Sequence, residues 1–169
     1  MYPFRFQPFL TVLGLTSTSI LPVVAIADVE VLHGRAHGHT YTVHLESRPF
    51  RRDGHRITKN SEGMYLLDGK EYIGEGGAGS LLPFTELSAF DVRVDGKRWH
   101  IPSRLWRDCY DPNLDKAHPP DSFRYVHVRL SRGGKRMDVE MSGSDASGGY
   151  DVTWHLRPDG RDRREFSYL

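Results

Sequence analysis

The chain has 169 residues, and its 23 lysines and arginines nearly balance its 22 aspartates and glutamates. This balance argues against a nucleic-acid-binding protein, which would carry a basic patch or stripe, and against membrane attachment by charge alone. The chain also contains a single cysteine, Cys109, so it can form no internal disulfide. We therefore expect the fold to be held together by its apolar core.

The first 27 residues have the composition of an export signal. Arg5 supplies a positive charge near the N-terminus, a long apolar stretch follows, and no acidic residue occurs before Asp28. Ala25 and Ala27 then form the small-residue pattern after which signal peptidases cleave. We therefore expect a cleaved signal peptide at residues 1–27 and a periplasmic or secreted mature protein.

An uncleaved membrane anchor is the alternative for the same segment, because its apolar part is about as long as a bilayer-spanning helix. The polar residues 16–19 and the helix-breaking Pro22 favour the cleaved signal. Removing the signal leaves residues 28–169, which we expect to form a single β-rich domain with no membrane span. Since Arg5 is lost with the signal, lysines and arginines fall from 23 to 22 and the mature chain is formally neutral.

Three histidines lie close together just after the expected cleavage point. His33, His37 and His39 fall within seven residues, and Gly34 and Gly38 between them would allow a loop to fold around an ion. Neutral imidazole is a good ligand for zinc and copper. A periplasmic metal-binding protein is therefore one candidate function, although a solvent-exposed histidine-rich loop is the simpler interpretation.

Apolar residues then recur at every second position, as they do in strands with one buried face. The alternating runs are Tyr41-Val43-Leu45, Phe90-Val92-Val94, Val126-Val128-Leu130, Met137-Val139-Met141 and Tyr150-Val152-Trp154-Leu156. Asp68-Gly69 and Asp95-Gly96 separate pairs of short runs and predict tight hairpins, because Asp-Gly readily adopts the positive φ angles of a type I′ turn. A last strand is expected around Phe166.

Residues 102–110 break this alternation. Pro102 stands where the first turn of a helix tolerates proline, and the apolar residues Leu105 and Cys109 are four positions apart. We expect one short helix or 3₁₀ segment there. The whole pattern predicts an all-β, single-domain antiparallel β-sandwich, or a barrel, of about eight strands.

Signs of catalysis are few. The sequence contains no Gly-x-Ser-x-Gly nucleophile motif, and its acidic residues are spread over separate runs. Residues 74–79 match the letters of a dinucleotide-binding fingerprint, but Pro83 follows within four residues, where that motif requires a helix. We therefore predict a protein that is not an enzyme and needs no cofactor, apart from the zinc or copper considered above. A small exported hydrolase is the alternative.

The segment from Gly143 to Tyr150 joins two strongly alternating runs and consists mostly of Gly, Ser and Asp. Loops that a rigid sheet holds in place often carry binding functions. Ser147 would offer a hydroxyl and Tyr150 a ring to a partner, while Gly148 and Gly149 would allow close approach. An ordinary hairpin loop, with Tyr150 turned inward as the first residue of the next strand, is the alternative.

Residues 139–150, with the sequence VEMSGSDASGGY, resemble the strand and loop of periplasmic lysozyme inhibitors, in particular of the i-type class. Those are small exported β-sandwich proteins in which a Ser-Gly-x-Tyr loop plugs the active-site cleft of lysozyme. The resemblance implies that Ser147 and Tyr150 insert into the cleft and that Gly148 and Gly149 permit the approach. We therefore expect an exported binding protein that presents end loops to a protein partner, with lysozyme as the specific candidate.

Overall fold

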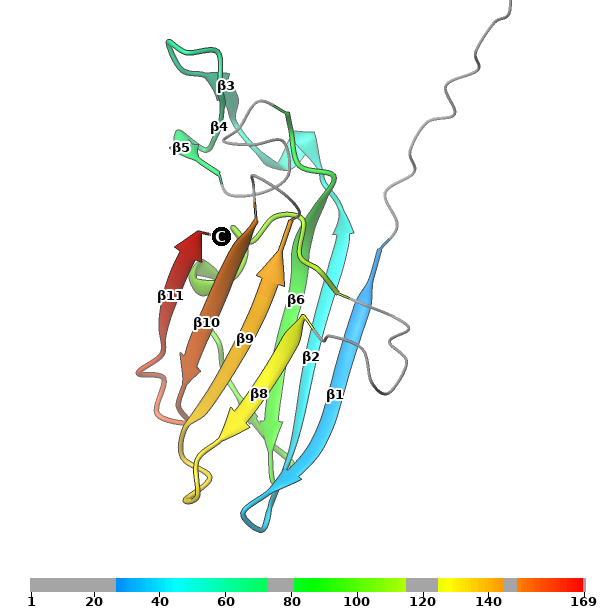
Figure 1. Ribbon diagram of the computed structural model, residues 1–169, viewed down its shortest axis with the longest axis vertical. Helices are drawn as coiled ribbons and strands as arrows, with labels where there is room; N and C mark the ends of the chain where they lie inside the picture. The colour runs from blue at the N-terminus through cyan, green and yellow to red at the C-terminus, as the bar shows by residue number, and fades with distance from the viewer. Residues whose placement is uncertain (1–26, 73–80, 115–124, 145–148, 169) are drawn as a thin grey trace, which may run out of the picture.

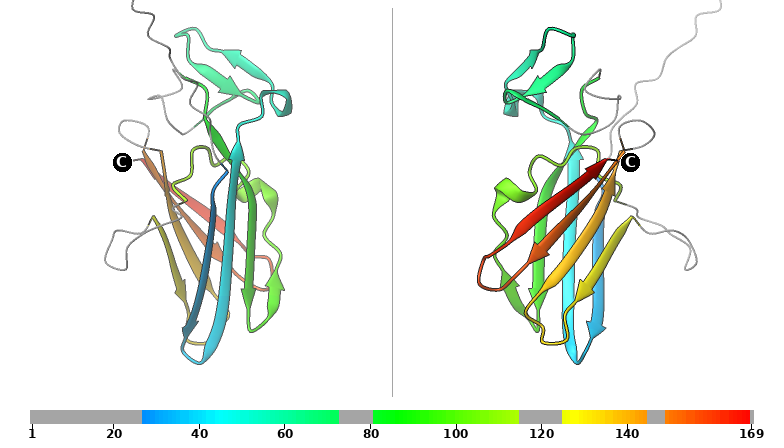
Figure 2. Two further views of the ribbon diagram at one scale, coloured as in Figure 1. Left: turned by 90° about the vertical axis from the view of Figure 1, so that its right-hand side faces the viewer. Right: turned by 60° about the vertical axis from the view of Figure 1, so that its left-hand side comes forward.

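The computed structural model describes residues 27–72, 81–114, 125–144 and 149–168. Within these ranges the protein consists of antiparallel strands in three sheets, which do not close into a barrel. Two four-stranded sheets pack face to face as a sandwich, and a third, small sheet extends from one end of it (Figure 1, Figure 2). The predicted all-β sandwich is thus confirmed, and the barrel that the sequence also allowed is not formed.

The first sheet has the order β1-β2-β6-β7, with β1 (Val29–Ala36), β2 (His39–Pro49), β6 (Thr85–Val94) and β7 (Lys97–Trp99). The second sheet has the order β11-β10-β9-β8, with β8 (Val126–Leu130), β9 (Met137–Gly143), β10 (Tyr150–Leu156) and β11 (Arg163–Tyr168). The third sheet contains β3 (Ile57–Lys59), β4 (Tyr65–Leu67) and β5 (Lys70–Glu71), and the 3₁₀ turn η1 (Arg52–Gly54) precedes it.

The core lies between the two four-stranded sheets, and the alternating residues of the sequence form it. The side chains with no exposed surface include Val43, Leu45 and Val92 from the first sheet and Met137, Val139, Val152, Trp154 and Leu156 from the second. The rings of Phe90 and Trp154 meet across the interface with centroids 4.7 Å apart. Because each large apolar side chain contributes about 1.5–3 kcal/mol when it is buried, this interface is the main source of stability.

Both predicted Asp-Gly hairpins are present. Asp68 and Gly69 join β4 to β5 with φ angles of 54° and 80°, and Asp95 and Gly96 join β6 to β7 with φ angles of 49° and 75°. Two successive positive φ angles are the mark of a type I′ turn, whose twist matches that of the paired strands. These turns fix the register of the strands that they connect.

The short helix expected at residues 102–110 is reduced to a single 3₁₀ turn, η2 (Ser103–Leu105). The helical conformation ends at Trp106, whose φ angle is −140°. The chain is extended again at Tyr110, which forms an isolated bridge with Glu86 of β6. Between η2 and this bridge the chain continues in hydrogen-bonded turns, in which the Cys109 N–H donates to the Trp106 backbone oxygen at 3.0 Å.

The histidine-rich segment forms a hairpin of long strands and not the exposed loop that was the simpler interpretation of the sequence. β1 pairs with β2 from Val29 to Ala36, and the chain turns at His37 and Gly38. Gly34 lies inside β1 because the ring of Tyr41 occupies the space beside it, where an added Cβ would lie 2.2 Å from the Tyr41 Cζ.

Gly143, at the end of β9, lies against the ring of Tyr150 in the same way, and an added Cβ there would lie 2.2 Å from the Tyr150 Cζ. We expect Gly143→Ala to lower the free energy of unfolding by about 1–3 kcal/mol, since the buried ring or the backbone has to shift. Urea denaturation measures the change. The control is Gly133→Ala, where an added Cβ meets nothing within 4 Å. Equal stability of the two variants would contradict this packing.

The third sheet lies at the end of the sandwich where β2 and β9 end and where β6 and β10 begin (Figure 1). The opposite end carries the short turns between β1 and β2 and between β6 and β7. Among the described residues, no helix has the length and apolar character needed to span a bilayer. Residues 1–26 of the predicted signal and residues 74–79 lie outside the described ranges.

Candidate functional site

The structure places Tyr150 in the core of the protein. Its side chain has no exposed surface, and its hydroxyl donates a 2.8 Å hydrogen bond to the backbone oxygen of Tyr110. Gly149 is also buried, whereas Ser147 and Gly148 lie outside the described residues. The insertion of Tyr150 into a cleft, expected from the resemblance, requires an exposed ring, whereas the ring is buried as in the alternative of an inward-turned strand residue. Tyr150 lies on the same face of β10 as Val152 and Trp154, and this face is turned toward the core.

The three clustered histidines do not converge. His33 pairs with Thr42, and its Nδ1 lies 3.1 Å from the Thr42 hydroxyl on the outer face of the first sheet. His39 lies on the opposite face of the same hairpin, with its Nδ1 2.7 Å from the Asp95 carboxylate. His37 occupies the turn. Strand alternation separates His33 from His39, and no group of three or more metal-ligating side chains is found among the described residues.

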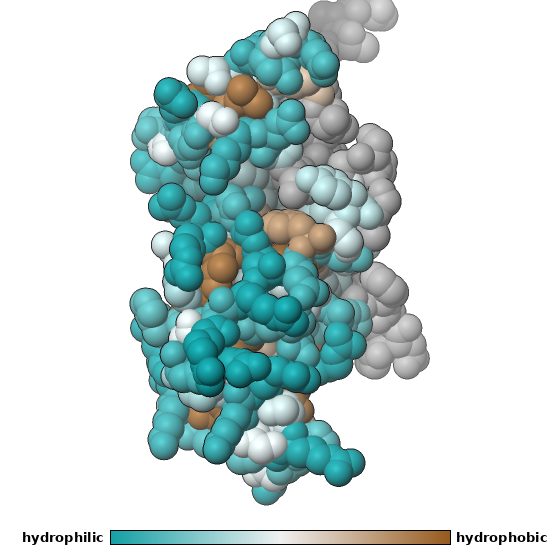
Figure 3. All heavy atoms as spheres, turned by 90° about the vertical axis from the view of Figure 1, so that its left-hand side faces the viewer, coloured by the Kyte–Doolittle hydropathy of each residue, from teal (hydrophilic) through white to brown (hydrophobic). Residues whose placement is uncertain are grey.

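A cavity of about 980 Å³ lies between the third sheet and the sandwich. Its walls come from the end of β2, η1, the third sheet, the start of β6, residues 103–110 and β11. Figure 3 views the side of the molecule that carries β5 and β11, where hydrophilic side chains cover most of the surface and apolar ones form small, separate patches. We call this cavity the end cleft.

The lining of the end cleft is rich in charge. Its basic side chains are Arg48, Arg51, Lys70, Arg104, Arg107 and Arg164. Its acidic side chains are Asp53, Asp68, Glu71, Glu86 and Asp108. The remaining functional groups include the imidazole of His55 and the rings of Tyr72, Trp106, Tyr110 and Phe166. A cleft of this size and polarity can hold a side chain or a short segment of a ligand.

His55 connects the third sheet to the sandwich. Its Nδ1 lies 2.9 Å from an oxygen of Asp68 in the β4–β5 turn, and its Nε2 lies 3.1 Å from an oxygen of Glu86 in β6. The other Glu86 oxygen accepts a 2.6 Å hydrogen bond from the Arg48 Nε. Glu86 is only 3% exposed although it lies on the outer face of the sheet, because this cluster covers it.

The two carboxylates stabilise the protonated form of His55. Burial by itself lowers the pKa of His55, but the hydrogen bonds to Asp68 and Glu86 outweigh burial, so the pKa lies above its ordinary value. The pKa of Asp68 is lowered, first by the backbone N–H of Arg56 and then by His55. With both ring nitrogens directed at carboxylates, His55 acts as a cationic link in the structure, and neither nitrogen is free to serve as a general base.

Aromatic rings pack against the His55 ring. The His55 ring stacks on Phe50, with centroids 5.1 Å apart, and Tyr110 meets both rings edge-on. Tyr72 packs edge-on against Tyr110 at 5.6 Å. Burial raises the pKa values of both tyrosines, to about 12 for Tyr72, so their hydroxyls remain protonated. The rings thereby hold His55 in place and exclude water from one side of it.

An ion pair between Arg164 and Asp108 also lines the end cleft. Arg164 of β11 pairs with Asp108 through both guanidinium nitrogens, and its Nη1 also donates to the backbone oxygen of Leu105 at 3.0 Å. The guanidinium carbon lies 4.3 Å from the centroid of the Phe166 ring. Neighbouring Cys109 is buried, and burial raises the pKa of its thiol, so it is not an activated nucleophile.

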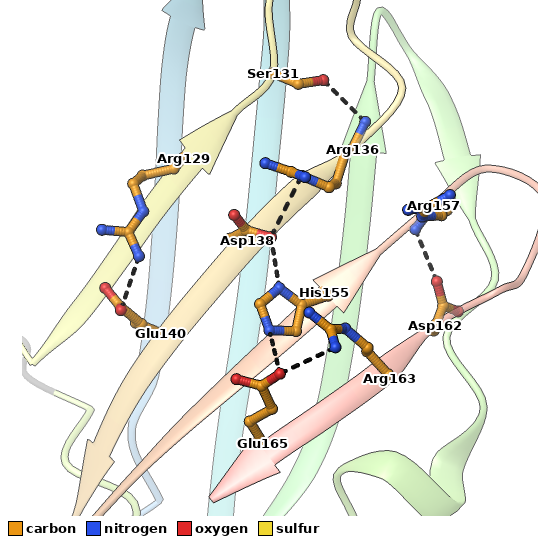
Figure 4. Close-up of polar contacts among 10 residues, drawn as sticks. All are labelled: Arg129, Ser131, Arg136, Asp138, Glu140, His155, Arg157, Asp162, Arg163 and Glu165. Carbon is orange, nitrogen blue, oxygen red and sulfur yellow. Dashed lines mark hydrogen bonds and ion pairs between the residues drawn. The ribbon is translucent and has the colours of Figure 1, made fainter. Parts of the chain in front are cut away.

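The outer face of the second sheet carries a separate charged network (Figure 4). His155 lies between two carboxylates, with its Nδ1 2.8 Å from Asp138 and its Nε2 3.4 Å from Glu165. Arg129 pairs with Glu140 at 2.9 Å and Arg163 with Glu165 at 3.2 Å. The contacts of His155 and the Arg129–Glu140 pair connect neighbouring strands, and such cross-strand pairs stabilise a sheet by about 0.2–1 kcal/mol each. Arg163 and Glu165 lie on the same strand, β11, and their contact does not join strands.

Sequence reasoning missed the end cleft. Asp68 and Glu86 follow His55 in the sequence by 13 and 31 residues. They share no motif or period, and Asp68 was recognised only for its turn. The one available signal was the position of polar residues at the ends of strands, where several loops of a sandwich meet.

No protein-family model matches the chain, and neither does any curated protein or solved structure with which it was compared.

Proposed function

We propose that this chain is an exported, non-enzymatic binding protein that engages a protein partner through the end of the sandwich that carries the end cleft. The observation that carries the proposal is the end cleft itself, a charged cavity of about 980 Å³ with walls from all three sheets. Ordered sheets hold its walls, so little conformational entropy is lost when a partner binds. β9 ends and β10 begins at this same end of the sandwich, and the proposal includes the residues between them in the binding surface.

Photo-crosslinking tests this assignment of the binding surface. A photoreactive residue is placed at Lys70 or at Arg104, in the lining of the end cleft, or at Lys135 near the opposite end. The mature protein is then irradiated with extracellular or periplasmic extract. We expect a discrete crosslinked protein from the first two positions and none from Lys135. Crosslinks from Lys135 alone would place the binding surface elsewhere and contradict the proposal.

Lysozyme is the specific partner to test first, because of the resemblance of residues 139–150 to the lysozyme inhibitors. Since Tyr150 is buried, the proposal assigns the contact to Ser147 and Gly148 and gives Tyr150 a supporting role. We expect the wild-type protein to inhibit at least one lysozyme of a panel, and Gly148→Asp to weaken inhibition about tenfold or more by adding bulk and charge at the contact.

Lys135→Ala, at the opposite end, is the matched control for this inhibition assay. It is expected to inhibit as the wild type does. Inhibition that survives in Gly148→Asp would remove the loop from the mechanism. Failure of the wild type to inhibit any lysozyme would remove lysozyme as the partner, and the crosslinking result would still decide the location of the binding surface.

A further inference from the structure

In the end cleft, more basic than acidic side chains lack an ion-pair or hydrogen-bond partner among the described residues. Among the described residues, its carboxylates are largely engaged: Asp53 with Arg51, Asp68 with His55, Glu86 with Arg48 and His55, and Asp108 with Arg164. The exposed side chains of Lys70, Arg104 and Arg107 form no ion pair or hydrogen bond with a described residue. Among the described carboxylates of the cleft lining, only Glu71 forms no ion pair or hydrogen bond with a described residue. The cleft therefore has more free cations than free anions.

Two buried donors in the same lining also lack an acceptor among the described residues. They are the Tyr72 hydroxyl and the Trp106 Nε1, for which the described part of the chain supplies no hydrogen-bond partner. An indole nitrogen can only donate, and a phenol of raised pKa keeps its proton and also donates. An unsatisfied buried donor costs about 1–3 kcal/mol, so each atom would gain from a ligand oxygen if its side chain turned toward the cleft. The lining as a whole is short of acceptors.

We propose that the end cleft binds an acidic segment of a protein partner, with Lys70 on the third sheet and Arg104 and Arg107 on the sandwich facing its carboxylates. This inference rests on the proposed binding function and adds the chemistry of the partner. The unpaired cations come from both sides of the cleft, so a chain of several carboxylates suits it better than a single small anion. Arginine also matches the two oxygens of a carboxylate with two parallel donors.

The direct test is fluorescence anisotropy of a labelled oligoglutamate peptide with the mature protein, at low ionic strength and at about 0.15 M salt, where charges are screened beyond about 8 Å. We expect the wild type to bind and Arg104→Glu/Arg107→Glu to bind about tenfold or more weakly. The matched control is Arg132→Glu/Lys135→Glu, which makes the same charge change in the β8–β9 turn and should bind as the wild type does.

Tyr72→Phe separates binding from stability. Because the Tyr72 hydroxyl has no hydrogen-bond partner in the described part of the chain, its removal should leave the free energy of unfolding unchanged or raise it, while binding of the peptide weakens severalfold. Thermal unfolding of every variant confirms that it is folded.

Three outcomes overturn the inference: no binding of oligoglutamate by the wild type, equal weakening in the two double variants, or binding of a sulfated polysaccharide in place of the peptide. Each of these outcomes leaves the crosslinking test of the binding surface intact, so the two proposals fail separately.

Discussion

Tyr150→Ala is expected to lower the free energy of unfolding by about 4 kcal/mol. The ring has no exposed surface, lies 5.7 Å from the Phe166 ring and fills the space over Gly143. Truncation removes apolar contacts and leaves a cavity, and it frees the backbone oxygen of Tyr110 from its hydrogen bond. Denaturation in urea, followed by tryptophan fluorescence, measures the loss.

Tyr150→Phe is the matched control for this prediction. It keeps the ring and removes only the hydroxyl, so we expect a loss of about 1–2 kcal/mol from the unsatisfied Tyr110 oxygen. If Tyr150 instead inserted into a partner, Tyr150→Ala would reduce binding and leave stability almost unchanged. A loss below about 1 kcal/mol in Tyr150→Ala would therefore contradict the buried position.

Glu86→Ala is expected to lower the free energy of unfolding by about 2–3 kcal/mol at pH 6. Glu86 is 3% exposed and bonds both His55 and Arg48, so its removal leaves the imidazolium of His55 with Asp68 alone. Because the Arg48 side chain is 50% exposed and can be solvated, the loss stays below that of a fully buried pair. Exposed Glu71, replaced by alanine, should change stability by less than about 0.5 kcal/mol.

The loss in Glu86→Ala should also depend on pH. The pKa of His55 is raised above its ordinary 6.5 in the folded state, so the stability that its proton contributes is complete below pH 6.5 and disappears as pH rises through the raised value. The pKa of Asp68 is lowered below 3.8, so its contribution is present above that pH and is lost under acid. The link is thus strongest between about pH 4 and pH 6.5.

Unfolding titrations from pH 5 to pH 9 measure this dependence. The stability difference between the wild type and Glu86→Ala should shrink as His55 loses its proton. The groups that face His55 are Asp68, Glu86, Phe50 and Tyr110, and the two tyrosines of the cleft keep their protons over this range because burial raises their pKa values. A difference that stays constant from pH 5 to pH 9 would show that His55 does not carry the effect.

Local patterns were enough to predict most of the sandwich. Alternation placed Val139 and Trp154 on an inner face, and the Asp-Gly pairs placed the hairpins, because both signals depend on residues a few positions apart. The strand from Val29 to Ala36 was missed, since Gly34 and the polar residues around it resemble a loop until the ring of Tyr41 is seen to fill the space beside the glycine.

The composition and order of residues by themselves determined an all-β sandwich with an apolar core, tight Asp-Gly turns and no internal disulfide. Only the tertiary structure decided which polar residues meet. It separated His33 from His39 on the two faces of one hairpin, turned Tyr150 into the core, and brought His55, Asp68 and Glu86 together at one end. The physical reason is that strand periodicity assigns each side chain to a face, whereas contacts between distant segments depend on how whole sheets pack.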